Sequence, residues 1–123
     1  SGHANFPDDV DGPLGHNLVM EGGTVSESQM IKSAKRAILV TRFHYINGFL
    51  DTPRALMTGM TRDGTFWIEK GEVRHAVRNM RFNEALFPLL GRVERLGAAE
   101  RVYGALIPPA VVRDFNFASG TRF

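Results

Sequence analysis

The sequence predicts an α+β fold built mainly from antiparallel β-sheet, arranged as a meander or a barrel-like closure of one, with two packing helices. Two observations support this prediction. Turn signals follow one another at short spacing, at residues 47–48, 62–64 and 70–71, which is typical of hairpins joined in series. Two other stretches, 27–36 and 83–96, carry apolar residues at helical intervals.

The composition is that of one globular domain. With 123 residues, 43% of them hydrophobic and 23% charged, the chain can bury a modest core, and we expect a single domain over residues 1–123. Residues 1–24 contain many Gly and Pro residues and have no apolar period, so we expect an extended lead-in there. Because the chain does not begin with Met, we expect it to be cut from a longer polypeptide.

Charge and cysteine content exclude several classes of protein. The net charge of +2 comes from well-mixed basic and acidic residues, which make no patch for nucleic acid. No apolar run reaches the roughly 18 residues of a membrane span. The absence of cysteine excludes disulfides, thiolate metal ligands and a cysteine nucleophile, and it fits a cytoplasmic location. We therefore expect no direct nucleic-acid partner and no membrane partner.

The first helix is predicted by a local capping signal. Ser26 followed by Gln29 makes a capping box, and Val25 with Met30 is placed to form a hydrophobic staple across it. We expect a helix over residues 27–36 that buries Met30 on its apolar side. All the groups that support this prediction lie within six residues of one another, so it needs no assumption about the rest of the fold.

Five short strands are predicted between the turns. Residues 37–40 are wholly apolar and the pattern then alternates, as in a strand that leaves a buried environment. A Thr-Pro pair at 52–53 breaks the pattern between two later candidates. Trp67 points away from the face shared by Phe66 and Ile68, so we expect it either under the second helix or in a protein interface. The five candidates are residues 37–45, 49–50, 56–61, 65–69 and 72–77.

The second helix is predicted over residues 83–96. Asn83 can cap this helix and Gly97 can end it, although Pro88 removes a backbone hydrogen bond and favours a later start. After a double-proline break, residues 111–117 alternate between apolar and polar side chains and predict a final half-buried strand. The apolar stripe of the predicted helix consists of Leu86, Phe87, Leu90 and Val93.

The residues themselves predict no active site. His44 and His75 fall on predicted strands and can meet across a sheet, but no carboxylate or thiolate completes a tetrahedral zinc site with them. We interpret both as buried, hydrogen-bonded strand residues. Asp51, Asp63 and Glu69 flank turns, where carboxylates usually support the local backbone. We therefore predict no catalytic, cofactor-binding or metal-binding residue in the chain.

Residues 39–45 read LVTRFHY and residues 58–73 read TGMTRDGTFWIEKGEV. These segments resemble a strand and a long central block of the C-terminal domain of the TldD/PmbA family, which also carries the label modulator of DNA gyrase. Residues 76–82 (AVRNMRF) and 111–117 (VVRDFNF) resemble its next segment and its last strand. The resemblance is spread over most of the chain.

The resemblance implies a part of a two-domain zinc peptidase that acts on unfolded or modified peptides, with a metal-binding subunit paired to a metal-free one. The family's metal histidines lie in a His-Glu-x-x-x-His helix upstream, and its cysteine ligand falls near Tyr103 and Gly104 of this sequence. This chain has neither that helix nor a cysteine. The resemblance therefore implies a metal-free subunit or a branch with other ligands, an inactive chain on its own, and zinc only in the full-length protein or its partner.

Two functions remain open at this point. In the first, the chain is a scaffold or interface domain of a peptidase assembly, and an extended peptide substrate adds to a free edge of its sheet. In the second, it is a non-catalytic structural or protein-interaction module, the metal-free partner. Both predict a companion TldD/PmbA-type subunit or a second copy of the chain as partner. Both also predict exposed apolar surface through which the isolated chain self-associates.

Overall fold

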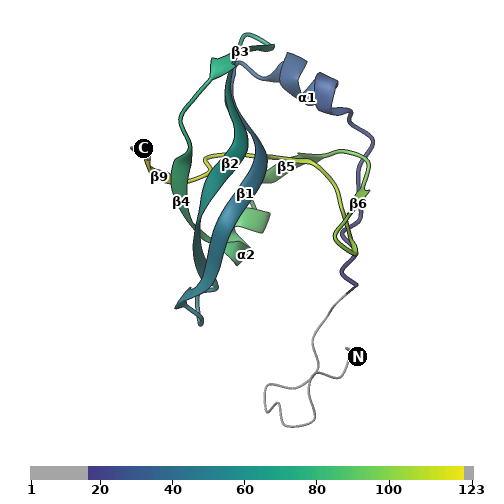
Figure 1. Cartoon of the computed structure of the whole chain (residues 1–123). Helices are drawn as coiled ribbons and strands as arrows, with labels where there is room; N and C mark the ends of the chain where they lie inside the picture. Colours follow the sequence, from purple (N-terminus) through teal and green to yellow (C-terminus); the bar gives the residue numbers. More distant parts are fainter. Residues whose placement is uncertain (1–16, 121–123) are drawn as a thin grey trace.

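The computed structural model describes residues 17–120, and its largest unit is an antiparallel sheet. Its strands β1 (Arg36–Asp51), β2 (Leu56–Glu69), β4 (Met80–Ala85) and β9 (Phe117–Gly120) lie side by side in that order, and β3 (Glu72–Ala76) pairs with one end of β2. Figure 1 shows β1 and β2 as a long twisted hairpin. The predicted antiparallel sheet is confirmed. No closed barrel forms among the described residues, because β1 and β9 lie at opposite edges of the sheet.

A second unit, here called the arm, comprises residues 93–112. Strand β5 (Val93–Leu96) pairs with β8 (Ala110–Val112), and between them β6 (Glu100–Val102) pairs with β7 (Ala105–Ile107), so one hairpin continues another. In Figure 1 the arm leaves the sheet behind β1 and extends away from it, with the chain that follows Asn17 alongside. Val19 bridges to Leu106 near the far end of the arm. Residues 1–16 of the predicted lead-in lie outside the described residues.

The first helix, α1 (Glu27–Ser33), confirms the capping prediction. The Gln29 N–H donates to Ser26 Oγ, and the Ser26 N–H donates to Gln29 Oε1 at 2.9 Å, so both halves of the capping box are present. Met30 is buried, as expected. The helix ends earlier than predicted, because β1 begins at Arg36. Neither described helix has the length and continuous apolar character that crossing a membrane requires.

The two longest strands run through the first two predicted turns, so both of those predictions are wrong. Residues 47–48 lie inside β1 and residues 62–64 inside β2. Asp63 takes a φ of 61°, and the pairing of β2 with β1 shifts register there, so an extra residue is absorbed as a β-bulge instead of a turn. The hairpin turns at the predicted break, between Asp51 and Leu56. The third predicted turn, at residues 70–71, is confirmed.

The predicted second helix is largely wrong, since α2 (Leu86–Leu90) is a single short turn. Asn83, the expected cap, lies in β4 opposite Thr58, and the expected last turn is β5. Pairing with β2 gives the backbone of β4 the hydrogen bonds that a helix would have supplied, so the long-range partner overrides the local signal. Pro88 lies within the first turn of α2, where a missing N–H has little effect. The expected apolar stripe is exposed at Leu86, Phe87 and Leu90.

The predicted final strand over residues 111–117 is divided by a turn. Strand β8 ends at Val112, Asp114 takes a φ of 50°, and β9 begins at Phe117. The apolar alternation therefore has another role. Phe115 lies 4.9 Å from Phe117 between ring centroids and also contacts Phe43 and Phe82, so the segment adds an aromatic cluster to one face of the sheet.

The core of the described residues is small. Gly59 leaves room for the Phe82 ring, because a Cβ at Gly59 would come within 2.6 Å of it. Thr61 is fully buried between β2 and β4, and its Oγ1 accepts a hydrogen bond from the Met80 N–H at 3.0 Å. The buried hydrophobic side chains are Met30, Ile68 and Phe82.

Candidate functional site

The structure separates the two histidines that the sequence placed on strands. His44 lies on β1 opposite Met60, and His75 lies on β3 opposite Trp67. Met60 and Trp67 are seven positions apart along β2, so at about 3.3 Å per residue the two histidines lie on the order of 20 Å apart. The expectation that they meet across the sheet is wrong. His44 is half-buried and His75 is exposed, so the interpretation of both as buried residues is also wrong.

Two of the three carboxylates that flank the predicted turns, Asp51 and Asp63, have side-chain or backbone partners. Asp51 Oδ1 accepts a hydrogen bond from the Arg54 N–H at 3.2 Å, across the turn between β1 and β2. Asp63 Oδ2 pairs with Arg42 at 2.7 Å at the surface of the sheet. Glu69 is half-buried at the end of β2. Among residues 17–120, no three His, Cys, Asp or Glu side chains gather in an arrangement that holds a metal ion.

The most buried carboxylate is one that sequence analysis missed. Glu84 is 4% exposed and lies on the same face of β4 as Phe82. Its Oε2 accepts a hydrogen bond from Arg92 Nη2 at 2.5 Å, and its Oε1 accepts one from the Asn116 N–H at 2.6 Å. We call Glu84 and Arg92 the clamp. The sequence around Glu84 gives no sign of these partners, because Arg92 follows α2 and Asn116 follows the arm.

The tip of the arm presents a fully exposed aromatic side chain. Tyr103 is 99% exposed and forms with Gly104 the two-residue turn between β6 and β7. Their φ values of 46° and 90° fit a type I′ turn, in which a bulky residue such as Tyr is an outlier. The other exposed apolar side chains of the arm and of the segment alongside it are Leu18, Val19, Val102 and Ile107.

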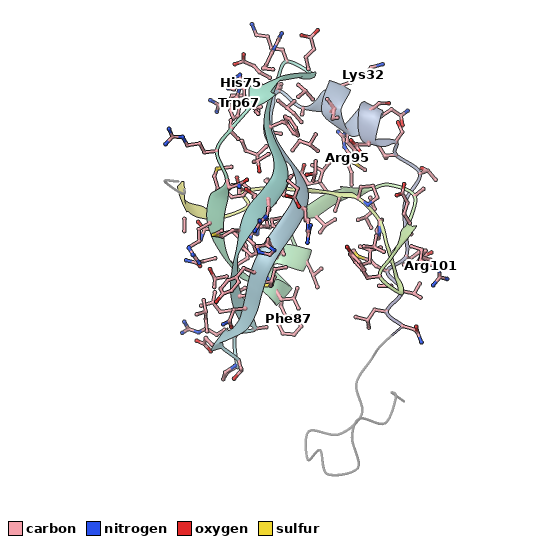
Figure 2. The ribbon with its side chains drawn as sticks, in the orientation of Figure 1. Lys32, Trp67, His75, Phe87, Arg95 and Arg101 are labelled. Carbon is pink, nitrogen blue, oxygen red and sulfur yellow. The ribbon has the colours of Figure 1, made fainter. Side chains whose placement is uncertain are left out.

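A second exposed apolar surface lies where β1 and β2 turn. Helix α2 sits beside this turn, because the Leu86 N–H donates to the Ala55 carbonyl at 3.1 Å. Figure 2 shows Phe87, which is 70% exposed, at this end of the sheet, and Tyr45 on β1 is 74% exposed. We call this region the hairpin-end surface; its residues are Tyr45, Ile46, Leu50, Leu86, Phe87 and Leu90.

Trp67 lies at the opposite end of the sheet from α2. It is half-buried on β2 and pairs with His75 on β3, next to which Figure 2 shows it. The expectation that the second helix covers Trp67 is therefore wrong, because α2 follows the other end of β4. The alternative, that Trp67 contributes to a protein interface, stays a prediction.

The donor groups of the described residues do not fit the zinc centre that the resemblance implies. Tyr103 and Gly104, at the position where the resemblance places a cysteine, form the exposed tip of the arm. A phenol does not replace a thiolate as a tetrahedral zinc ligand, and the whole chain has no cysteine. His44 and His75 are too far apart to share an ion. The described part of the chain thus offers strands and exposed apolar side chains, without a set of metal ligands.

Comparisons with known proteins agree with the resemblance. Residues 2–119 match the family model of the PmbA/TldA metallopeptidase C-terminal domain. The fold is similar to that of TldE from Thermococcus kodakarensis, with a TM-score of 0.64 and 18% sequence identity, over 75% of this chain and 21% of the TldE chain. This chain thus spans about a fifth of the length of that relative. No curated protein matches it. On the family match, the chain belongs to the PmbA/TldA metallopeptidase C-terminal domain family.

Proposed function

We propose that the chain is a scaffold and interface domain of a TldD/PmbA-type peptidase assembly, and that it does not itself bind the catalytic metal. The observation that carries this proposal is the imbalance between a small core and a large exposed apolar surface. Among the described residues, three large hydrophobic side chains are buried and thirteen are exposed. A domain that leaves this many large apolar side chains exposed is typically covered by a partner.

The partner in this proposal is a companion TldD/PmbA-type subunit. The arm tip and the hairpin-end surface lie on separate elements, the arm on one side and the turn of β1 and β2 with α2 on the other. Two separated contact regions suit a domain that is held within a larger assembly better than one that binds a single small ligand. TldE, whose fold is similar, is a much longer chain. Pairing with a second copy of this chain is the competing outcome.

Strand β1 offers a place for a peptide substrate of the assembly. It lies at an edge of the sheet and runs for 16 residues. An extended peptide can pair with such an edge through backbone hydrogen bonds, which read little of the peptide's sequence. The register shift between His44 and Asn47, with a φ of 54° at Tyr45, interrupts the regular edge. The earlier shift, between Val40 and Arg42, has its extra residue in β2, so we place the peptide along residues 36–43.

The alternative function is a non-catalytic structural or protein-interaction module, the metal-free partner of a zinc-binding subunit. The lack of cysteine and the separation of His44 from His75 favour this alternative. In both cases we propose that zinc is held in another part of the full-length protein or in its partner. We also propose a cytoplasmic location and no direct contact with nucleic acid or membrane.

The test compares the isolated chain with the full-length protein, alone and mixed with its companion subunit. Zinc content by elemental analysis and hydrolysis of an unfolded peptide are measured on each sample. We expect the isolated chain to show neither, and the full-length assembly to show both. Zinc in neither the full-length protein nor its companion would favour the structural alternative, and zinc held tightly by the isolated chain would contradict the proposal.

The interface role is tested in the full-length protein with a pair of matched variants. Phe87→Glu places a charge on the hairpin-end surface, whereas Val73→Glu places one on β3, where Val73 is 45% exposed outside that surface. We expect Phe87→Glu to abolish assembly in size-exclusion chromatography and Val73→Glu to leave it unchanged. If the Phe87→Glu protein assembles like the unaltered one, the hairpin-end surface is not the interface.

A further inference from the structure

Both strands of the arm leave the body of the domain at one point. Arg92 directly precedes β5, and Arg113 directly follows β8. The Arg113 N–H donates to the Arg92 carbonyl at 3.0 Å, which closes the root of the arm. Any motion of the arm relative to the sheet must therefore bend the chain at Arg92 and Arg113.

The clamp lies at this root and joins four segments. Glu84 belongs to β4, and it binds both the Arg92 guanidinium and the Asn116 N–H, which lies beyond the arm. The guanidinium also donates to the carbonyl oxygens of Pro88 in α2, at 3.3 Å, and of Arg113 at 3.3 Å. A further donation goes from Arg92 Nη1 to the Asp114 carbonyl. The sheet, α2 and both ends of the arm thus meet at one side chain.

Burial makes the clamp stiff. The side chains of Glu84 and Arg92 are 4% and 24% exposed, so water does not compete freely for their hydrogen bonds. The planar guanidinium uses its donors in a fixed geometry, which holds the accepting carbonyls in fixed directions. Removing the Arg92 charge would leave the Glu84 carboxylate buried without a cation, which is costly.

A second side-chain tie between the arm and the body is of a different kind. Arg95 Nη1 donates to Ser33 Oγ of α1, and both residues are exposed. Exposed polar contacts between flexible side chains contribute little, because water replaces them readily. The Gly23 N–H donates to the Gly97 carbonyl at 2.7 Å. This backbone hydrogen bond joins the segment before α1 to the middle of the arm.

We propose that the Glu84–Arg92 clamp is a positioning device, which fixes the direction of the arm relative to the sheet and thereby the place of Tyr103 at its tip. Tyr103 is fully exposed and has an unfavourable backbone conformation, so it does not serve the stability of the domain. We infer that it is placed for a partner. A rigid root holds the tip in one orientation before any partner binds. The proposal rests on the geometry of this domain and does not depend on the proposed peptidase role.

The test measures the distance between the arm and the sheet in solution. The chain contains no cysteine, so spin labels can be placed on Tyr103→Cys at the tip and Val73→Cys on β3 without removing native thiols. Double electron–electron resonance then gives the distribution of distances between them. Amide hydrogen exchange at Asn116 reports on the clamp itself, and fluorescence of Trp67, the single tryptophan, reports on the sheet.

In the labelled chain, we expect Arg92→Met to widen the distance distribution about twofold and to speed exchange at Asn116 about tenfold, with Trp67 emission unchanged. The matched control, Arg95→Met, removes the exposed tie to Ser33 and should leave the distribution as it was. Equal widening in both variants, or no widening in a folded Arg92→Met chain, would overturn the proposal.

If Arg92→Met does not fold, Glu84→Gln removes the charge at nearly the same shape, and its single amide oxygen can accept from the Asn116 N–H or from the Arg92 guanidinium but not from both. We expect Glu84→Gln to widen the distribution less than twofold but measurably, since the amide keeps an oxygen for the Asn116 N–H. A folded Glu84→Gln chain with an unaltered distribution would also overturn the proposal. These outcomes are independent of zinc content, hydrolysis and subunit assembly, which test the proposed function.

Discussion

The central sheet and the arm hold their strands together in different ways. In the sheet, β1 and β2 have 16 and 14 residues, and both β2 and β4 carry buried side chains. In the arm, each strand has three or four residues and none of their side chains is buried. The sheet can therefore stabilise itself, whereas the arm depends on ties at its root and on whatever covers its tip.

Truncating an aromatic side chain in the core of the sheet should have the largest effect on the free energy of unfolding. Phe82 is 2% exposed and contacts Phe43 and Phe115, so Phe82→Ala should lower the free energy of unfolding by about 3–5 kcal/mol. Phe87→Ala, at a position that is 70% exposed, should change it by less than about 0.5 kcal/mol. Urea denaturation followed by circular dichroism checks both, and similar losses in the two variants would contradict the comparison.

Loss of the clamp should have the next largest effect. Arg92→Met leaves the Glu84 carboxylate buried without a cation, so the free energy of unfolding should fall by about 3 kcal/mol. The matched control is Arg113→Met, which removes an exposed pair with Glu94 and should reduce that free energy by less than about 1 kcal/mol. Thermal unfolding measures both. A clamp variant as stable as the control would mean that the root of the arm is held by other contacts.

A buried hydroxyl in the sheet should have an intermediate effect. Thr61→Val keeps the shape of the side chain but leaves the Met80 N–H without its acceptor, which should lower the free energy of unfolding by about 1–3 kcal/mol. The same change at the exposed Thr41, whose Oγ1 donates to the Gly64 carbonyl, should have an effect below about 0.5 kcal/mol. Equal effects in urea denaturation would show that burial does not govern the difference.

The smallest effect should have the opposite sign. Tyr103→Asn places at the arm tip a residue that adopts positive φ readily, so it should raise the free energy of unfolding by about 0.5–1 kcal/mol. The sheet variants above all lower it. A loss of stability in the Tyr103→Asn chain, measured by thermal unfolding, would mean that Tyr103 makes stabilising contacts within the domain and is not kept for a partner.

Local signals predicted those parts of the fold whose partners are close in sequence. The capping box of Ser26 and Gln29 lies within four residues, and α1 begins where it predicts. The turn at residues 70–71 joins neighbouring strands with positive φ at both positions, and it is present. The antiparallel class was predicted from three closely spaced turns, of which the one at residues 70–71 is present. The class is nevertheless correct, because β1 and β2 are joined by a hairpin at the predicted break near residues 52–53.

Signals of the same strength failed where a distant strand supplied the hydrogen bonds. The Asn47-Gly48 pair is absorbed into β1, and Asn83 is held in β4 by its pairing with Thr58. In each case a turn or cap would have had to compete with the backbone hydrogen bonds of the paired strand. The residues of these short stretches do not show which strand will pair with them, so they do not predict whether the turn or cap forms.

The sequence by itself determined the family, the antiparallel class, the first helix and the turn at residues 70–71. These depend on motifs and on hydrogen bonds between near neighbours. Only the tertiary structure decided that His44 and His75 lie apart, that Glu84 meets Arg92, and that Tyr103 stands at the tip of an arm. Those relations join residues through bulges, strand registers and a nested hairpin, and their geometry is set by the summed pairing of the whole sheet.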